Sequence, residues 1–170
     1  MAARREILAP LILAVIATAT IAAAWGFELY GGYVPCALCL EERVPYYAGI
    51  PIALAALAAS FFGGPDRLRR LLLAAVALVF AYGAYLGIYH AGAEWGFWPG
   101  PTDCAAGSAP PATSAEDLLS QIEGMRIVSC SEASWRFPTG WGLSFAGWNA
   151  AASLLLVALA LWGALTTRRA

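Results

Sequence analysis

Four stretches of this chain contain no Asp, Glu, Lys or Arg, and each is long enough to cross a lipid bilayer: Ile7–Phe27, Val44–Pro65, Leu71–Ala93 and Phe137–Thr167. A helix that crosses about 30 Å of hydrocarbon needs about 20 apolar residues. The composition agrees, because 61% of the residues are hydrophobic and only 12% are charged. Since open sheets leave backbone groups unsatisfied in lipid, the sequence predicts an all-α membrane protein with four transmembrane helices.

The expected fold is a single domain over residues 1–170, a four-helix bundle with spans at approximately 7–26, 44–62, 71–90 and 141–165. Two longer connections remain, at approximately 27–43 and 91–140. The first apolar run also resembles a cleaved signal peptide, but it is longer than the roughly 7–15 residues of a signal core. We therefore expect it to be a retained span.

The basic residues are all Arg, and most of them lie at one side of the expected bundle: Arg4, Arg5, Arg67, Arg69, Arg70, Arg168 and Arg169. Under the positive-inside rule this side is cytoplasmic, with both chain ends on it. The two longer connections then face outward, and they carry every cysteine. Their remaining charge is mostly acidic, which argues against a nucleic-acid partner.

Two patterns predict how the helices pack. Gly83 and Gly87 have the small-xxx-small spacing that lets helices approach closely in lipid, which favours packing within the bundle over a dimer interface. In the second connection, Ser114 and Asp117 form a capping-box pattern before an apolar face made of Leu118, Leu119, Ile122 and Met125. This predicts a short amphipathic helix, either on the membrane surface or against the bundle mouth.

A Cys-x-x-Cys pair, Cys36 and Cys39, precedes the second span. Such a pair becomes reactive when one thiolate is stabilised. The start of a helix has a partial positive charge and free N–H groups, and Arg43 follows Cys39 by one helical turn. Both features favour a thiolate at Cys39. The motif alone is a weak signal, because the same spacing also binds metals.

Three polar residues near the outer boundary are candidates for binding an electron acceptor: Glu42, Arg43 and His90. Arg43 is either an interfacial cation with a Glu partner or a hydrogen-bond donor to a carbonyl oxygen that gains negative charge. His90, the only histidine, is either an interfacial anchor or a proton donor to the same acceptor.

Cys104 and Cys130 form the second candidate pair, and three interpretations of the four cysteines remain open. A static disulfide in each loop of a membrane adaptor is one. A zinc or copper site made by Cys36, Cys39, His90 and one loop cysteine is another. The third is a relay, in which the loop disulfide exchanges with the first pair through mixed disulfides.

Taken together, these motifs resemble the bacterial disulfide bond formation protein B (DsbB) family over most of the chain. The matching segments are Cys36-Ala-Leu-Cys39-Leu-Glu-Glu42-Arg43, Tyr89-His90, Gly100-Pro-Thr-Asp-Cys104, Cys130, Trp135-Arg136-Phe137 and Gly142-Leu-Ser-Phe-Ala-Gly-Trp148-Asn149. Pro138-Thr139-Gly140 departs from the family pattern, close to the expected start of the fourth span.

The resemblance implies a thiol:quinone oxidoreductase of the bacterial inner membrane, with periplasmic cysteines. A reduced thioredoxin-fold partner of the DsbA type attacks Cys104 of a Cys104–Cys130 disulfide, Cys130 attacks Cys36, and Cys39 is freed beside a bound ubiquinone or menaquinone. Arg43 and His90 match the family's quinone-contacting positions, with Glu42 as a neighbouring support. The resemblance thus implies catalytic roles for all four cysteines.

A vitamin-K-epoxide-reductase-like enzyme is the main alternative, because it also joins a four-helix bundle to a Cys-x-x-Cys pair and a quinone. There the pair lies near the end of a late span, whereas here it opens the second. In either case the energetics require a strong acceptor. DsbA-type oxidants have reduction potentials of about −120 mV. Each interval of about 30 mV by which the acceptor's potential falls below that value costs about 1.4 kcal/mol for two electrons.

Overall fold

The long helices of the computed structural model are α1 (Ala2–Leu29), α3 (Val44–Phe61), α4 (Asp66–Glu94) and α6 (Phe145–Thr166), and the short helix α2 (Ala37–Glu41) directly precedes α3. The structure describes residues 2–101, 114–116, 119, 126–139 and 141–166. Within these residues, four helical segments are long and apolar enough to cross a membrane: Glu6–Leu29, Ala37–Phe61, Asp66–Glu94 and Phe145–Thr166. The prediction of an all-α, four-span membrane protein is confirmed.

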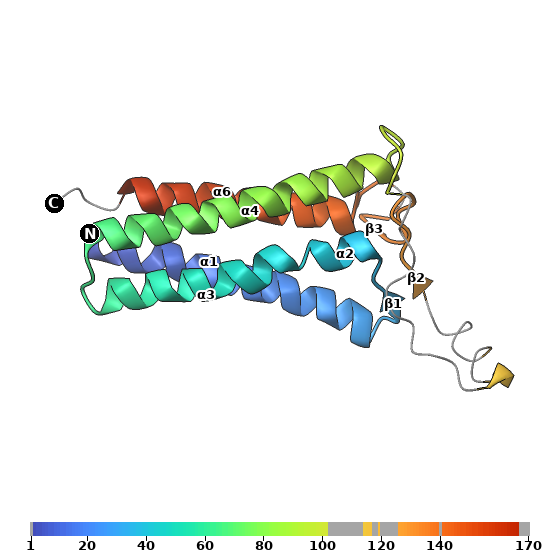
Figure 1. Ribbon diagram of the computed structural model, residues 1–170, viewed down its shortest axis with the longest axis horizontal. Helices are drawn as coiled ribbons and strands as arrows, with labels where there is room; N and C mark the ends of the chain where they lie inside the picture. The colour runs from blue at the N-terminus through green and yellow to red at the C-terminus, as the bar shows by residue number, and fades with distance from the viewer. Residues whose placement is uncertain (1, 102–113, 117–118, 120–125, 140, 167–170) are drawn as a thin grey trace.

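The four long helices lie side by side along the length of the molecule (Figure 1), with α4 packed against α3 and α6, and α1 against the same two helices. Gly83 and Gly87 make the α4 contacts close. A Cβ atom on Gly87 would lie 2.8 Å from the backbone nitrogen of Ala150 in α6, and one on Gly83 would lie 3.1 Å from Ser153 Oγ. The small-residue spacing therefore serves packing within the bundle, as predicted.

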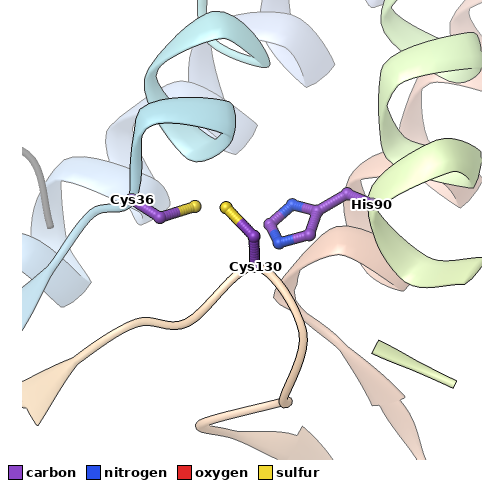
Figure 2. A group of neighbouring side chains, drawn as sticks. All are labelled: Cys36, His90 and Cys130. Carbon is purple, nitrogen blue, oxygen red and sulfur yellow. The ribbon is translucent and has the colours of Figure 1, made fainter. Parts of the chain in front are cut away.

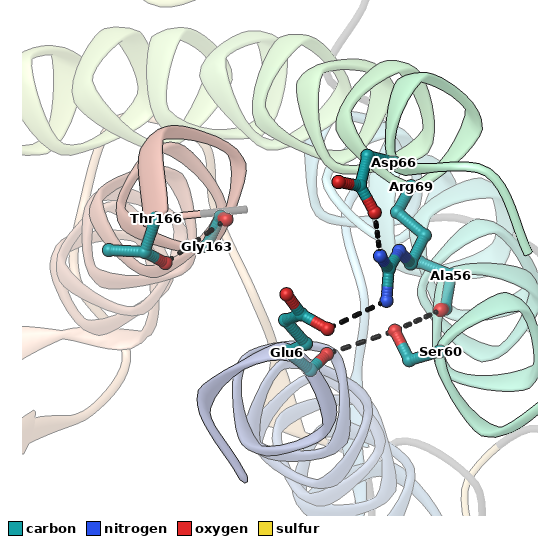
Figure 3. A network of polar contacts seen from close by, with 7 residues as sticks. All are labelled: Glu6, Ala56, Ser60, Asp66, Arg69, Gly163 and Thr166. Atoms are coloured by element: carbon teal, nitrogen blue, oxygen red, sulfur yellow. Dashed lines mark hydrogen bonds and ion pairs between the residues drawn. The ribbon is translucent and has the colours of Figure 1, made fainter. Parts of the chain in front are cut away.

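Both ends of the chain and the α3–α4 link lie at one end of the bundle, and the cysteine-bearing connections lie at the other (Figure 1). At the first of these ends, polar contacts join three helices (Figure 3). Arg69 of α4 donates to Glu6 Oε2 of α1 at 2.8 Å and also contacts Asp66. Ser60 of α3 donates to the carbonyl oxygens of Glu6 and Ala56, both at 2.9 Å. Because Arg69 is buried, these carboxylates offset the cost of removing its charge from water.

The Cys-x-x-Cys segment folds as a separate short helix because of the residues at its two ends. Cys36 is the N-cap of α2, and its Sγ accepts the backbone N–H of Cys39 at 3.1 Å. Arg43 is the N-cap of α3, where Pro45 stands in the first turn and its missing N–H is tolerated. The break between the helices places Glu42 and Arg43 at the cysteine end of the bundle.

Two short strands join the two longer connections. Strand β1 (Tyr33–Val34) pairs in parallel with β2 (Arg126–Ile127), with Tyr33 opposite Arg126. The N–H of Arg126 donates to Gly32 O at 2.9 Å, and that of Val128 donates to Val34 O at 3.1 Å. Since both strands run in the same direction, the residues that follow them also run alongside each other. This register carries Cys130 toward Cys36.

The chain enters the fourth span through a second strand pair, β3 (Arg136–Phe137) with antiparallel β4 (Leu143–Ser144). The Ser144 hydroxyl oxygen then accepts the N–H of Gly147 at 3.1 Å, in the manner of an N-cap. Because residues 143–144 are paired as a strand, α6 begins at Phe145, later than the expected start of the span near residue 141. The expected amphipathic helix over residues 114–125 falls mostly outside the described residues.

Candidate functional site

Three predicted site residues meet at the cysteine end: Cys36, His90 and Cys130. Their two sulfur atoms and a ring nitrogen of His90 all lie within 4.8 Å of one another. The two sulfurs point toward each other with the imidazole beside them (Figure 2). All three side chains are buried, and the two cysteines pack with Leu38 and Leu86. Residues from the first connection, α4 and the second connection are thus brought into one water-poor cluster.

The sulfur atoms in this cluster differ in bonding. Cys36 and Cys39 are free thiols, whereas Cys130 is in a disulfide. Cys104 lies outside the described residues. A disulfide sulfur is not the thiolate that zinc or copper binds, so with these bonds Cys130 does not complete a metal site with Cys36 and His90.

Cys36 is the thiol that its surroundings favour as a thiolate. The hydrogen bond from the Cys39 thiol lowers the pKa of Cys36 to about 5 against the opposing effect of burial, and His90 and the Cys39 N–H act in the same direction. The sequence favoured Cys39 for this state. The difference arises because α2 begins after Cys36, so the free N–H groups of its first turn point at Cys36.

Beside the cluster lies a cavity of about 370 Å³ between α1, α2, α3, α4 and α6. Apolar and aromatic side chains form most of its wall, including Ile21, Phe27, Phe145 and Trp148. Cys39 lines it, together with three other predicted residues, Glu42, Arg43 and His90. Its size and mostly apolar wall are typical of small-molecule sites, which hold about 300–1,000 Å³. The two thiols therefore face different surroundings, because Cys36 lies against Cys130 and Cys39 against the cavity.

Arg43 supplies a cation to the cavity wall. Its Nη1 donates to Glu28 Oε2 at 2.6 Å, and its guanidinium lies 5.9 Å from the centre of the Trp25 ring. Only 11% of the Arg43 side chain is exposed. The sequence indicated a Glu partner for Arg43 with Glu42 adjacent, but the partner comes from the end of α1, fifteen residues earlier.

Glu42 pairs instead with His90. His90 Nδ1 lies 2.9 Å from Glu42 Oε1, and both residues are buried. The carboxylate fixes the orientation of the ring, as such partners do for other functional histidines. Among the described residues, His90 Nε2 has no nitrogen or oxygen partner. The imidazole thus lies between the sulfur cluster and the cavity.

Two polar residues of the cavity were not identified as site candidates from the sequence. Tyr46 donates its hydroxyl hydrogen to Asn149 Oδ1 at 2.8 Å, and both side chains line the cavity. Asn149 stands in a span that has no charged residue and few polar ones, where a polar side chain is costly unless it has a function or a partner. That cost is the signal that could have identified Asn149, whereas Tyr46 resembles the many other aromatic residues of the chain.

A family model described as disulfide bond formation protein DsbB matches residues 5–163 of the chain. No curated protein and no solved structure gave a match. The matched range includes both thiol pairs, the residues that line the cavity and all four long helices except the first three residues of α1 and the last three of α6. The chain therefore belongs to the DsbB family, as a multi-pass membrane oxidoreductase that acts in disulfide bond formation.

Proposed function

We propose that this protein reoxidises a periplasmic thioredoxin-fold dithiol oxidase of the DsbA type and passes the electrons to a membrane quinone. The observation that carries the proposal is that Cys36 and Cys39 have different neighbours. Cys36 lies within 4.8 Å of the disulfide-bonded Cys130, and Cys39 lines an apolar cavity with a cation in its wall. One sulfur is positioned for exchange with the outer loop and the other for transfer into the bilayer.

The proposed exchange begins at the loop disulfide. A partner thiolate attacks Cys104 of the Cys104–Cys130 disulfide and releases the Cys130 thiolate, which attacks Cys36 of a Cys36–Cys39 disulfide and releases Cys39. The partner's second thiolate then displaces Cys104, and the partner leaves as a disulfide. Cys104 attacks Cys130, restores the loop disulfide and displaces Cys36. Cys36 and Cys39 now hold the electron pair as thiols.

This reduced state matches the sulfur bonding of the structure, with Cys36 and Cys39 free and Cys130 in a disulfide. The lowered pKa of Cys36, about 5, supports its displacement from Cys130, because a thiol of low pKa is the better leaving group. The quinone, ubiquinone or menaquinone, accepts two electrons and two protons, which allows the Cys36–Cys39 disulfide to form again.

The cavity residues fit a quinone ring. The apolar wall suits the ring and its tail, and Arg43 would donate to a carbonyl oxygen. His90 Nε2 is buried and has no nitrogen or oxygen partner among the described residues, and Glu42 holds the ring, so His90 would supply a proton or a hydrogen bond from the side of the sulfur cluster. Glu42 then acts through His90 as a positioning residue.

The same proposal places the cysteine end in the periplasm and the opposite end, which carries Arg67, Arg69 and Arg70, in the cytoplasm of a bacterial inner membrane. The strong acceptor that a DsbA-type partner requires is a respiratory quinone in that membrane. Disulfide formation in secreted proteins would then be driven by respiration.

The test is an anaerobic reaction of the purified protein with a reduced thioredoxin-fold partner and a soluble quinone, followed by absorbance of the quinol. We expect one quinol for each partner disulfide, and no turnover in Cys39→Ser or Cys104→Ser. A membrane adaptor with structural disulfides would form no quinol in any variant. A vitamin-K-epoxide-reductase-like enzyme would turn over with a quinone epoxide, which we expect to be inert here. Equal turnover of wild type and Cys39→Ser contradicts the proposal.

A further inference from the structure

A buried amide hydrogen donor of the cavity remains unused. Among the described residues, the Nδ2 atom of Asn149 is inaccessible to solvent and has no hydrogen-bond partner. An unsatisfied buried donor typically costs about 1–3 kcal/mol, so one in a cavity wall needs an explanation. Three other donors in the cavity wall are already engaged. Arg43 is bonded to Glu28, the Thr20 hydroxyl donates to Ile16 O at 2.9 Å, and Tyr46 donates to Asn149.

The orientation of the Asn149 amide is set by its neighbours. Tyr46 is 2% exposed and Ser153 is fully buried, and their oxygen atoms lie 3.4 Å apart. Since the Tyr46 hydroxyl donates to Asn149 Oδ1 at 2.8 Å, it accepts from Ser153. The carbonyl side of the amide is thereby occupied, whereas its NH₂ group has no hydrogen-bond partner among the described residues.

The position of Asn149 complements the donors already described. Arg43 and His90 enter the cavity wall from the α2–α3 break and from α4, whereas Asn149 comes from the second turn of α6. A para-quinone ring carries a carbonyl oxygen on each of two opposite sides. Arg43 can hold only one of these oxygens, and His90 lies on the side of the sulfur cluster, so a donor from α6 would add a further point of attachment.

We propose that the Asn149 side-chain amide, oriented by Tyr46, donates a hydrogen bond to one carbonyl oxygen of the quinone and so adds a point of attachment from α6 to those of Arg43 and His90. The inference rests on the proposed quinone reaction, and it assigns to α6 a binding residue for that substrate. Among the described residues, the side-chain hydrogen bond of Asn149 is with Tyr46 and not with a cysteine, so we assign it to binding the quinone rather than to thiol exchange.

The experiment uses the full-length protein in detergent with a short-chain ubiquinone whose carbonyl carbons carry ¹³C. Infrared difference spectra report the two carbonyl bands of the bound ring. In Asn149→Ala we expect one band to move to higher wavenumber while the other stays. Tyr46→Phe, which frees the amide to turn, should broaden or move the same band. Unchanged bands in Asn149→Ala overturn the inference.

Affinity supplies the second readout, through quenching of Trp135 and Trp148 fluorescence, because both indoles line the cavity. Loss of one hydrogen bond should weaken quinone binding about tenfold in Asn149→Ala. The lipid-facing control Leu155→Ala, on the same helix and 49% exposed, should bind as wild type does. An equal loss in Leu155→Ala would mean that any change in α6 disturbs the cavity, and it would overturn the specific assignment.

Thiol exchange with a reduced partner, measured without quinone, separates the two proposals. We expect it to be the same in Asn149→Ala as in wild type. If the wild-type protein neither binds nor reduces a quinone, the proposed function fails. If wild type binds quinone and Asn149→Ala gives the same bands and affinity, only the inference about Asn149 fails. Alanine is common in α6, and Ala150 and Ala151 follow directly, so the variant should retain the helix.

Discussion

Cys36 and Cys39 lie one helical turn apart, yet their surroundings give them different chemistry. Cys36 receives the Cys39 N–H and lies beside Cys130 and His90. Cys39 faces the cavity. At the residue scale this asymmetry is the basis of the proposed direction of electron flow, since each thiol has a distinct neighbour with which to react.

The lowered pKa of Cys36 predicts a specific pH dependence. A free thiol has a pKa of about 8.5, whereas the hydrogen bond from the Cys39 thiol lowers that of Cys36 to about 5. We expect ultraviolet thiolate absorbance from Cys36 to persist at neutral pH and to disappear as the pH falls through about 5. The stability that this thiolate contributes is fully present above the ordinary thiol pKa and is lost over the same acid range.

The matched control for that titration is Cys39→Ala, which removes the donated hydrogen bond but keeps Cys36. We expect its thiolate to disappear at a higher pH than in the protein with both cysteines. A Cys36 titration near the ordinary thiol pKa in the unaltered protein would contradict the assignment of the thiolate to Cys36.

The sequence identified much of the site at the residue scale, for a physical reason. Thiols, a cation, a carboxylate and a histidine are conspicuous in a chain with so few charges, and Glu42, Arg43 and His90 all line the cavity with Cys39. The pairings were not readable, because they depend on which helices meet. Arg43 takes Glu28 of α1, and Glu42 takes His90 of α4. Their proposed roles remain predictions.

At the scale of helices and strands, the site depends on close contact between α4 and α6. Gly87 of α4 lies against the backbone of Ala150 in α6. One turn after Gly87, His90 lines the cavity, and so does Asn149, which precedes Ala150. Two glycines allow a direct test of this packing, because Gly87 lies in close helix contact and Gly26 of α1 does not.

Gly87→Ala should destabilise the protein by about 1–3 kcal/mol, because overpacking forces helices apart. The added Cβ would lie 2.8 Å from a backbone atom, which cannot move as a side chain does. The change in the free energy of unfolding is measured by titration with a denaturing detergent, with circular dichroism as the signal. Gly26→Ala in α1 is the control, because its Cβ would meet nothing within 4 Å. It should be neutral or stabilising by about 0.5–1 kcal/mol. A Gly87→Ala protein as stable as Gly26→Ala would exclude close packing at this point.

The helices themselves were predictable because length and hydropathy determine what can cross a bilayer. The strand pairs were not, since β1, β2, β3 and β4 are two residues each and carry no periodic pattern. Yet β1–β2 pairing is what aligns Cys36 with Cys130, and β3–β4 pairing delays the start of α6 to Phe145. Local contacts between loops thus determine the geometry of the sulfur cluster.

At the scale of the whole molecule, the two ends of the bundle have different tasks. The end with both chain termini is closed by the contacts of Arg69, Glu6, Asp66 and Ser60 (Figure 3). The other end gathers the sulfur cluster and the cavity from α1, α2, α3, α4 and α6 and from both longer connections. A bundle with its reactive groups at one end fits the proposed transfer of electrons from a soluble thiol partner to a lipid-soluble acceptor.

The central claim is that Cys36, and not Cys39, exchanges with the loop disulfide. The most direct measurement is mass spectrometry of disulfide-linked peptides from the Cys39→Ser and Cys36→Ser variants, each incubated with an alkylating reagent that traps a displaced Cys104 thiol. We expect a Cys36–Cys130 linkage to accumulate in Cys39→Ser, and no Cys39–Cys130 linkage in Cys36→Ser. An intact Cys104–Cys130 disulfide in both variants, or a linkage from Cys39 alone, would contradict the claim.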